Sequence, residues 1–124
     1  IGVESVSSRQ TKKIRDTEHV ICWFESRTSY KISKPPNLPS KLGLEAEDLY
    51  IHGHAQGRYQ AWRCTGLGPP KWIPLPQGTK RKLPGLKEPR HFVLTAKGLP
   101  SWVLSSSLDR AYKGVKTEAL RSTS

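Results

Sequence analysis

Prolines and glycines interrupt this chain so often that its ordered segments must be short. The 124 residues include ten of each, and seven of the prolines lie between residues 69 and 100. Proline cannot donate a ladder hydrogen bond, and glycine weakens a helix. Only 35% of the residues are apolar, which is low for a globular domain. We therefore expect one modest core with long irregular arms.

Runs of β-branched and aromatic residues lie between these breaks and predict short strands. We expect strands at 17–24, 28–33, 49–52, 58–65, 71–75 and 91–95. The 28–33 run would pair antiparallel with 17–24, and turns are expected at Gly53, at 56–57 and at 66–70. The acids at 45–48 resemble the first turn of a helix. The predicted fold class is β-rich, all-β or α+β, with a small antiparallel sheet or a partly open barrel.

The polarity of the two ends suggests how the chain is organised. Residues 1–16 read as a polar, basic arm, 17–104 as a single small β-rich domain, and 105–124 as a polar tail or a short helix. Because the chain starts at Ile1 and holds no methionine, we expect that something preceded Ile1. No apolar run approaches the roughly 20 residues that cross a bilayer, so no transmembrane segment is predicted.

Charge is the strongest indication of a partner. Lysine and arginine number 21 against ten acids, which gives a net charge of +11. Residues 70–97 carry seven cations and one acid, so +6 of the total lies there. Cations mixed with aromatic side chains suit nucleic acid. The predicted nucleic-acid contacts are Arg58, Lys71, Lys80, Arg81, Lys82, Lys87 and Arg90, with Trp72 beside a sugar or base. Trp23 and Trp102 are assigned to the core.

The histidines allow two further hypotheses. His52 and His54 would share one face of a strand and could bind Zn²⁺ with Cys22 or Cys64. Two histidines with a lysine could instead cleave RNA by acid–base catalysis. The paired ligand spacings of zinc sites are missing, and nothing in the sequence places the histidines for catalysis. We therefore predict no catalytic residue, no metal site and no cofactor.

The state of the two cysteines distinguishes a protein with free thiols from a secreted protein with a disulfide. Cys22 and Cys64 both lie beside large aromatic residues, which favours buried free thiols over a disulfide. A bridge between them would instead suit a secreted basic protein that binds acidic glycans or a receptor.

One local pattern is similar to a known family. Gly57-Arg58-Tyr59, Gly68-Pro69, Trp72-Ile73-Pro74 and the following Lys80-Arg81-Lys82 occur in this order. Asp48–Leu75 thereby resembles the C-terminal SH3-like DNA-binding module of retroviral integrases, over less than a quarter of the chain. The resemblance implies a viral module that binds DNA or RNA.

The leading hypothesis is a non-enzymatic nucleic-acid-binding protein. We expect RNA rather than DNA as partner, and charge neutralisation as the mechanism. The expected setting is a structural component of a ribonucleoprotein such as a ribosome, among other proteins in a large assembly. The expected location is intracellular, with cytoplasm and organelle both open.

Overall fold

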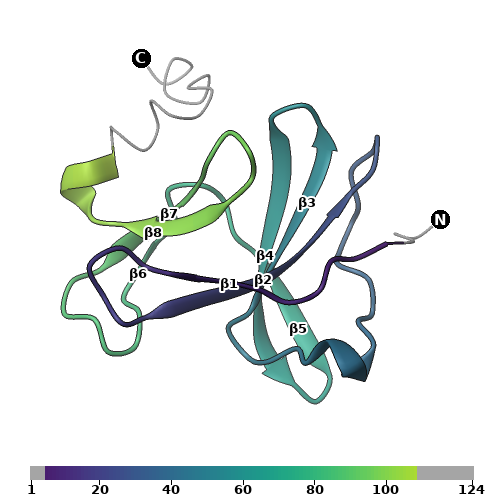
Figure 1. The fold of residues 1–124 in the computed structure, drawn as a ribbon, viewed down its shortest axis with the longest axis horizontal. Coiled ribbons are helices and arrows are strands. Elements are labelled where there is room, and N and C mark those ends of the chain that lie inside the picture. Colours follow the sequence, from purple (N-terminus) through teal and green to yellow (C-terminus); the bar gives the residue numbers. More distant parts are fainter. Residues whose placement is uncertain (1–4, 109–124) are drawn as a thin grey trace. The chain divides into compact units, whose positions relative to one another are not determined.

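The computed structural model describes residues 5–108 and confirms a β-rich fold (Figure 1). The chain divides into two compact units, Ile1–Leu75 (unit 1) and Pro76–Ser124 (unit 2). Each unit is built on one sheet. The predicted division into arm, single domain and tail stays a prediction, and the polar tail or short helix expected over 105–124 lies mostly outside the described residues.

Unit 1 holds a five-stranded sheet in which the strands keep their sequence order. The strands are β1 (Gln10–Lys13), β2 (Val20–Arg27), β3 (Leu49–Ala55), β4 (Arg58–Leu67) and β5 (Pro70–Pro74). β2 and β3 are parallel, whereas the other neighbours are antiparallel. The sheet is therefore mixed rather than antiparallel, and it does not close into a barrel.

Unit 2 holds a three-stranded antiparallel sheet of β6 (Lys80–Arg81), β7 (Arg90–Leu94) and β8 (Pro100–Val103). The sequence predicted β7 as the last strand, and β8 was missed because four residues beginning with proline give little periodicity. The Phe92 and Trp102 rings, opposite each other on β7 and β8, have centroids 5.4 Å apart. Trp102 is 3% exposed, which confirms its assignment to the core.

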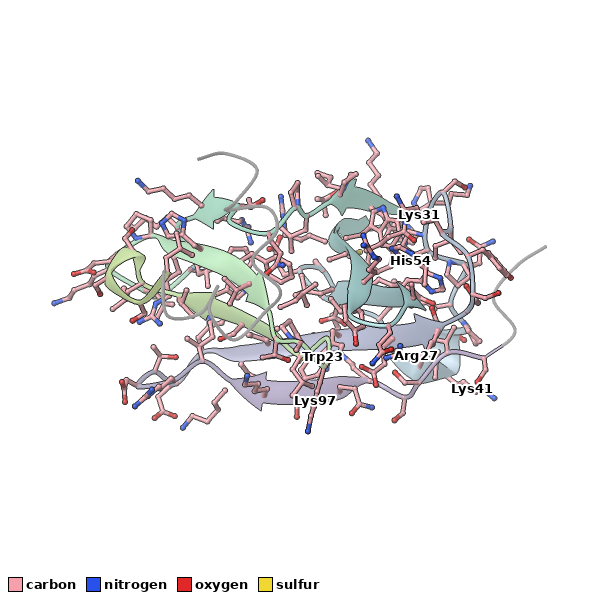
Figure 2. The ribbon with its side chains drawn as sticks, turned by 90° about the horizontal axis from the view of Figure 1, so that it is seen from above. Trp23, Arg27, Lys31, Lys41, His54 and Lys97 are labelled. Atoms are coloured by element: carbon pink, nitrogen blue, oxygen red, sulfur yellow. The ribbon has the colours of Figure 1, made fainter. Side chains whose placement is uncertain are left out.

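The core of unit 1 is a row of aromatic residues across three strands. Phe24, Tyr50 and Trp62 are register partners on β2, β3 and β4, and all three are buried. Trp23 lies next to Phe24 in the chain, so its side chain points to the other face of the sheet. It is also buried, as predicted (Figure 2). Within residues 5–108, no helix is long and apolar enough to span a membrane.

The segment predicted as a strand at 28–33 is not one. Its backbone forms no ladder: Thr28 N–H donates to Gly53 O of β3 at 2.9 Å, and side chains hold further parts of the segment. Gln60 accepts a hydrogen bond from Ile32 N and donates one to Ile32 O, each at 2.9 Å. The Tyr30 carbonyl accepts from His52 Nε2 at 2.9 Å. Alternating residues predicted the strand, but these long-range bonds satisfy the backbone without a ladder.

The expected turn at Gly53 is also wrong. Gly53 lies inside β3 opposite Tyr59 of β4, and the hairpin turns only at Gln56-Gly57. Gly57 has a φ of 69°, which suits glycine at a tight turn. β3 is thus longer than the sequence indicated.

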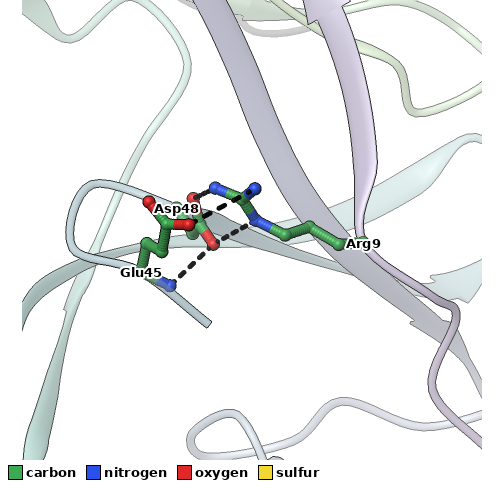
Figure 3. A network of polar contacts seen from close by, with 3 residues as sticks. All are labelled: Arg9, Glu45 and Asp48. Atoms are coloured by element: carbon green, nitrogen blue, oxygen red, sulfur yellow. Dashed lines mark hydrogen bonds and ion pairs between the residues drawn. The ribbon is translucent and has the colours of Figure 1, made fainter. Parts of the chain in front are cut away.

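Residues of the predicted N-terminal arm belong to the sheet of unit 1. Ser7 N donates to Glu25 O at 2.9 Å, and β1 pairs with β2. Arg9 binds the buried carboxylate of Asp48 through two hydrogen bonds (Figure 3). The predicted helical turn at 45–48 is a tight turn, closed by Asp48 N–H to Glu45 O at 3.1 Å, that presents Asp48 to Arg9.

Candidate nucleic-acid interface

Five of the predicted contact residues lie on one hairpin of unit 2. We call residues 80–90 the basic hairpin; it comprises β6, the loop 82–89 and the first residue of β7. Its five cations, minus Glu88, give a local charge of +4. They are Lys80, Arg81, Lys82, Lys87 and Arg90. Lys80, Lys82 and Lys87 are exposed, whereas Arg81 and Arg90 are half-buried.

The loop of the basic hairpin is anchored to the protein. Leu83 is only 3% exposed and begins a turn that Leu86 N–H closes on the Leu83 carbonyl at 3.2 Å. Pro84 and Gly85 occupy the centre of this turn, and Gly85 has a φ of 82°. Proline followed by a left-handed glycine is the sequence of a type II turn. The cations are therefore presented by an ordered loop.

The segment before β6 also supports the hairpin. Gly78 N–H donates to Phe92 O at 2.7 Å, and Phe92 N–H donates to Thr79 O at 2.9 Å. Gln77 Oε1 accepts from Leu94 N–H at 2.8 Å. The region 77–90 lies between the strands predicted at 71–75 and 91–95 and contains no predicted strand. It is instead ordered by pairing along β7.

Two arginines face each other at the base of the hairpin. Arg81 of β6 is the register partner of Arg90 of β7. Like charges placed opposite each other destabilise a sheet unless a counter-charge is near. Arg90 Nη1 donates to Trp102 O at a long 3.4 Å, and the buried Arg90 Nε has no hydrogen-bond partner.

The other three predicted contacts belong to unit 1. Arg58 is exposed at the start of β4, and Lys71 is exposed on β5. Trp72 is half-buried, and its ring lies 6.0 Å from that of Tyr50 at an interplanar angle of 74°. Trp72 therefore packs on the core of unit 1, which leaves less of its ring for a base.

The buried histidine His52 has a structural environment. Tyr50 Oη donates to Ser26 Oγ at 2.8 Å, and Ser26 Oγ lies 2.8 Å from His52 Nδ1. Because Nε2 must donate to the Tyr30 carbonyl, Nδ1 is the acceptor in a neutral ring. Both ring nitrogens are thus occupied, and neither is positioned to act on a substrate. That the protein is not an enzyme stays a prediction.

Among the described residues, the structure shows neither the zinc site nor the disulfide that were considered from the sequence. His91 bonds to Gly78 O at 3.2 Å and to Ser105 Oγ at 2.8 Å. Among residues 5–108, no group of three or more histidine, cysteine or acidic side chains could hold a metal ion. Cys22 and Cys64 are both free thiols, as favoured from the sequence, and burial raises the pKa of the Cys22 thiol.

Sequence reasoning missed a second group of cations on unit 1. Arg27 lies over the ring of Tyr59, with its Cζ 5.5 Å from the ring centroid. Lys31 and His54 lie near each other in Figure 2. Burial, followed by the charges of Lys31, His52 and Arg58, lowers the pKa of His54. No motif signals these contacts: Arg27 meets Tyr59 through the pairing of β2, β3 and β4, and Lys31, which is not in a strand, influences His54 of β3.

No protein-family model matches this chain, and no curated protein or solved structure matches it.

Proposed function

We propose that this protein binds RNA through the basic hairpin and does so without catalysis. The observation that carries the proposal is the concentration of five cations on an ordered hairpin that holds one acid. Leu83 and the turn at Gly85 limit the conformations of the loop, so less order has to be imposed on binding. Cations held in this way neutralise phosphates and release counterions.

The shape of the hairpin favours RNA over duplex DNA. Many motifs that read bases in duplex DNA place a helix in the major groove, and others use a two-stranded β-ribbon. The helical segments within residues 5–107 are the two 3₁₀ turns η1 (Ser40–Leu42) and η2 (Ser105–Ser107), and these residues contain no α-helix. A short basic hairpin instead contacts phosphates, which suits single strands and irregular RNA surfaces. A structural place in a ribonucleoprotein such as a ribosome, beside other proteins inside the cell, fits this mode of binding.

A virus-derived SH3-like module that binds DNA or RNA is the second candidate. Gly57-Arg58-Tyr59 of the resemblance spans the turn before β4 and the start of β4, Gly68-Pro69 forms the turn between β4 and β5, and Trp72-Ile73-Pro74 lies on β5. β3, β4 and β5 form a consecutive antiparallel meander. The parallel pairing of β2 with β3, and the open sheet, are less typical of an SH3-like barrel. Preference for duplex DNA would select this candidate.

Binding should be measured by fluorescence anisotropy with single-stranded RNA, duplex RNA and duplex DNA of equal length across a salt series. The test variant replaces Lys80, Arg81 and Lys82 by Ala. For a single strand, three lost phosphate contacts should reduce the log–log salt slope by about 2. A charge-matched control replaces the exposed cations Arg15, Lys34 and Lys41 of unit 1 by Ala.

Equal losses in the two triple variants would show that only net charge matters and would contradict a site at the hairpin. Affinity that does not fall with salt would overturn the electrostatic mechanism altogether. Tighter binding to duplex DNA than to either RNA would reject RNA as the partner. Turnover of the RNA during the measurement would contradict the absence of catalysis.

A further inference from the structure

Arg27, Gly53 and Tyr59 form a row across three strands of unit 1. Arg27 of β2 is the register partner of Gly53 on β3, and Gly53 is the partner of Tyr59 on β4. The three side-chain positions therefore share one face of the sheet. Arg27 Nη2 donates a hydrogen bond to Tyr59 Oη at 3.2 Å. The guanidinium is thus held beside the aromatic ring at a fixed place.

Gly53 makes room for this arrangement. A Cβ at residue 53 would lie 3.1 Å from Arg27 Nη1, 3.2 Å from Arg27 Cζ and 3.2 Å from Tyr59 Cε1. These separations are tighter than most Cβ contacts, so a side chain at residue 53 would require the guanidinium and the ring to move by a few tenths of an ångström. Because Gly53 has no positive φ, glycine is favoured here by its missing side chain and not by its backbone conformation. The guanidinium lies directly against the sheet.

The pair faces solvent. Arg27 is exposed and Tyr59 is half-buried (Figure 2 shows Arg27 at the end of β2). The register pairing of β5 with β4 ends at Pro74 and Trp62 and does not reach Tyr59. β5 therefore does not flank the row of Arg27, Gly53 and Tyr59. Since one side of the guanidinium rests on Gly53, its other side is directed away from the sheet.

A held guanidinium beside an aromatic ring is suited to unpaired bases. Arginine planes and aromatic rings are the surfaces on which proteins stack the splayed bases of single-stranded RNA. An exposed pair of this kind adds little to folding stability. Its hydrogen bond removes rotamer freedom before any ligand arrives, which favours binding.

We propose that Arg27, Gly53 and Tyr59 form a stacking site for an unpaired nucleobase of single-stranded RNA. The inference rests on the proposed function and adds to it a base contact on unit 1. The basic hairpin supplies phosphate contacts that do not depend on the base. The two kinds of contact can be separated, because one responds to base removal and the other to salt.

The experiment compares two RNA strands of about twelve nucleotides, one with all bases and one with abasic sites at its central positions. Both carry the same phosphates. The unmodified protein should bind the base-bearing strand about tenfold more tightly, as expected for one stacked base. Tyr59→Leu should remove this difference and leave the salt slope unchanged, since it alters no charge. Tyr30→Leu is the matched control, because Tyr30 is an exposed tyrosine elsewhere in unit 1.

Two further variants test the same site without removing the ring. Gly53→Val should displace the guanidinium, and Arg27→Lys should keep the charge but remove the plane; both should reduce the preference for bases severalfold. Thermal unfolding should be measured for every variant, and the comparison uses only the variants that fold.

A preference for bases that survives in folded Tyr59→Leu, Gly53→Val and Arg27→Lys proteins would overturn the stacking site. Equal binding of the two strands by the unmodified protein would do the same. In both cases salt-dependent binding through the basic hairpin would be untouched. Failure of the proposed function would look different, because neither strand would then bind in a salt-dependent way.

Discussion

Arg9 holds the carboxylate of Asp48 across 39 positions of the chain, with hydrogen bonds from Nε to Oδ2 at 2.9 Å and from Nη2 to Oδ1 at 2.8 Å. The Asp48 side chain is only 4% exposed, and Glu45 N–H also donates to it at 3.0 Å. The hydrogen bond with Asp48 raises the pKa of Arg9. This contact fastens the segment before β1 to the turn before β3.

Arg9→Ala should destabilise unit 1 strongly, because it leaves the buried Asp48 carboxylate without its counter-charge. Loss of one partner of a buried ion pair costs about 3 kcal/mol or more. Arg15→Ala is the control, since the Arg15 side chain is 92% exposed, and it should change stability by less than about 0.5 kcal/mol. Urea unfolding measures both. Equal effects of the two changes would show that the Arg9–Asp48 contact is not needed for stability.

The chain of hydrogen bonds from Tyr50 through Ser26 to His52 should behave as one unit. Ser26→Ala removes the acceptor of Tyr50 Oη and the donor to His52 Nδ1, and it should cost about 1–3 kcal/mol. Tyr50→Phe removes only one hydroxyl and should cost less. In a double-mutant cycle, the loss for the pair should be smaller than the sum of the single losses. Strict additivity in urea unfolding would contradict the network.

Gly85 should contribute to RNA binding through backbone conformation. Its φ of 82° is unfavourable for alanine, although no atom lies within 4 Å of an added Cβ. Gly85→Ala should therefore strain the turn by about 1 kcal/mol and weaken RNA binding without any change in charge. Gly66→Ala is matched, because Gly66 also has open space but no positive φ. The prediction is wrong if both variants bind RNA with the same affinity.

His54 should titrate below its ordinary pKa, because burial, followed by the charges of Lys31, His52 and Arg58, disfavours the imidazolium. Since the folded pKa is lower than the unfolded one, the stability contribution of His54 is present above about pH 6.5. It is lost as the pH falls through the folded pKa. Lys31→Ala should raise the His54 pKa in an NMR titration, whereas Lys34→Ala should not. An unchanged pKa in the Lys31 variant would show that Lys31 does not influence His54.

Local sequence patterns predicted most strands well, because burial on both faces of a sheet demands runs of apolar and β-branched residues. β2, β4 and β7 were expected within a few residues of their observed bounds. The pattern failed at 28–33, where His52 and Gln60 supply the hydrogen bonds that a strand would have needed. It also failed at β1, whose four polar residues pair with β2 without an apolar period.

The sequence by itself determined that the protein is β-rich, that Trp23 and Trp102 are core residues, and that residues 80–90 carry a concentration of positive charge. These properties depend on composition and on neighbours in the chain. Only the tertiary structure decided that β2 and β3 are parallel, that His52 is enclosed by Ser26 and Tyr30, and that Arg27 rests on Gly53 beside Tyr59. Each of these contacts joins residues more than twenty positions apart. These contacts depend on strand order and register, and neither of these can be predicted from local periodicity in the sequence.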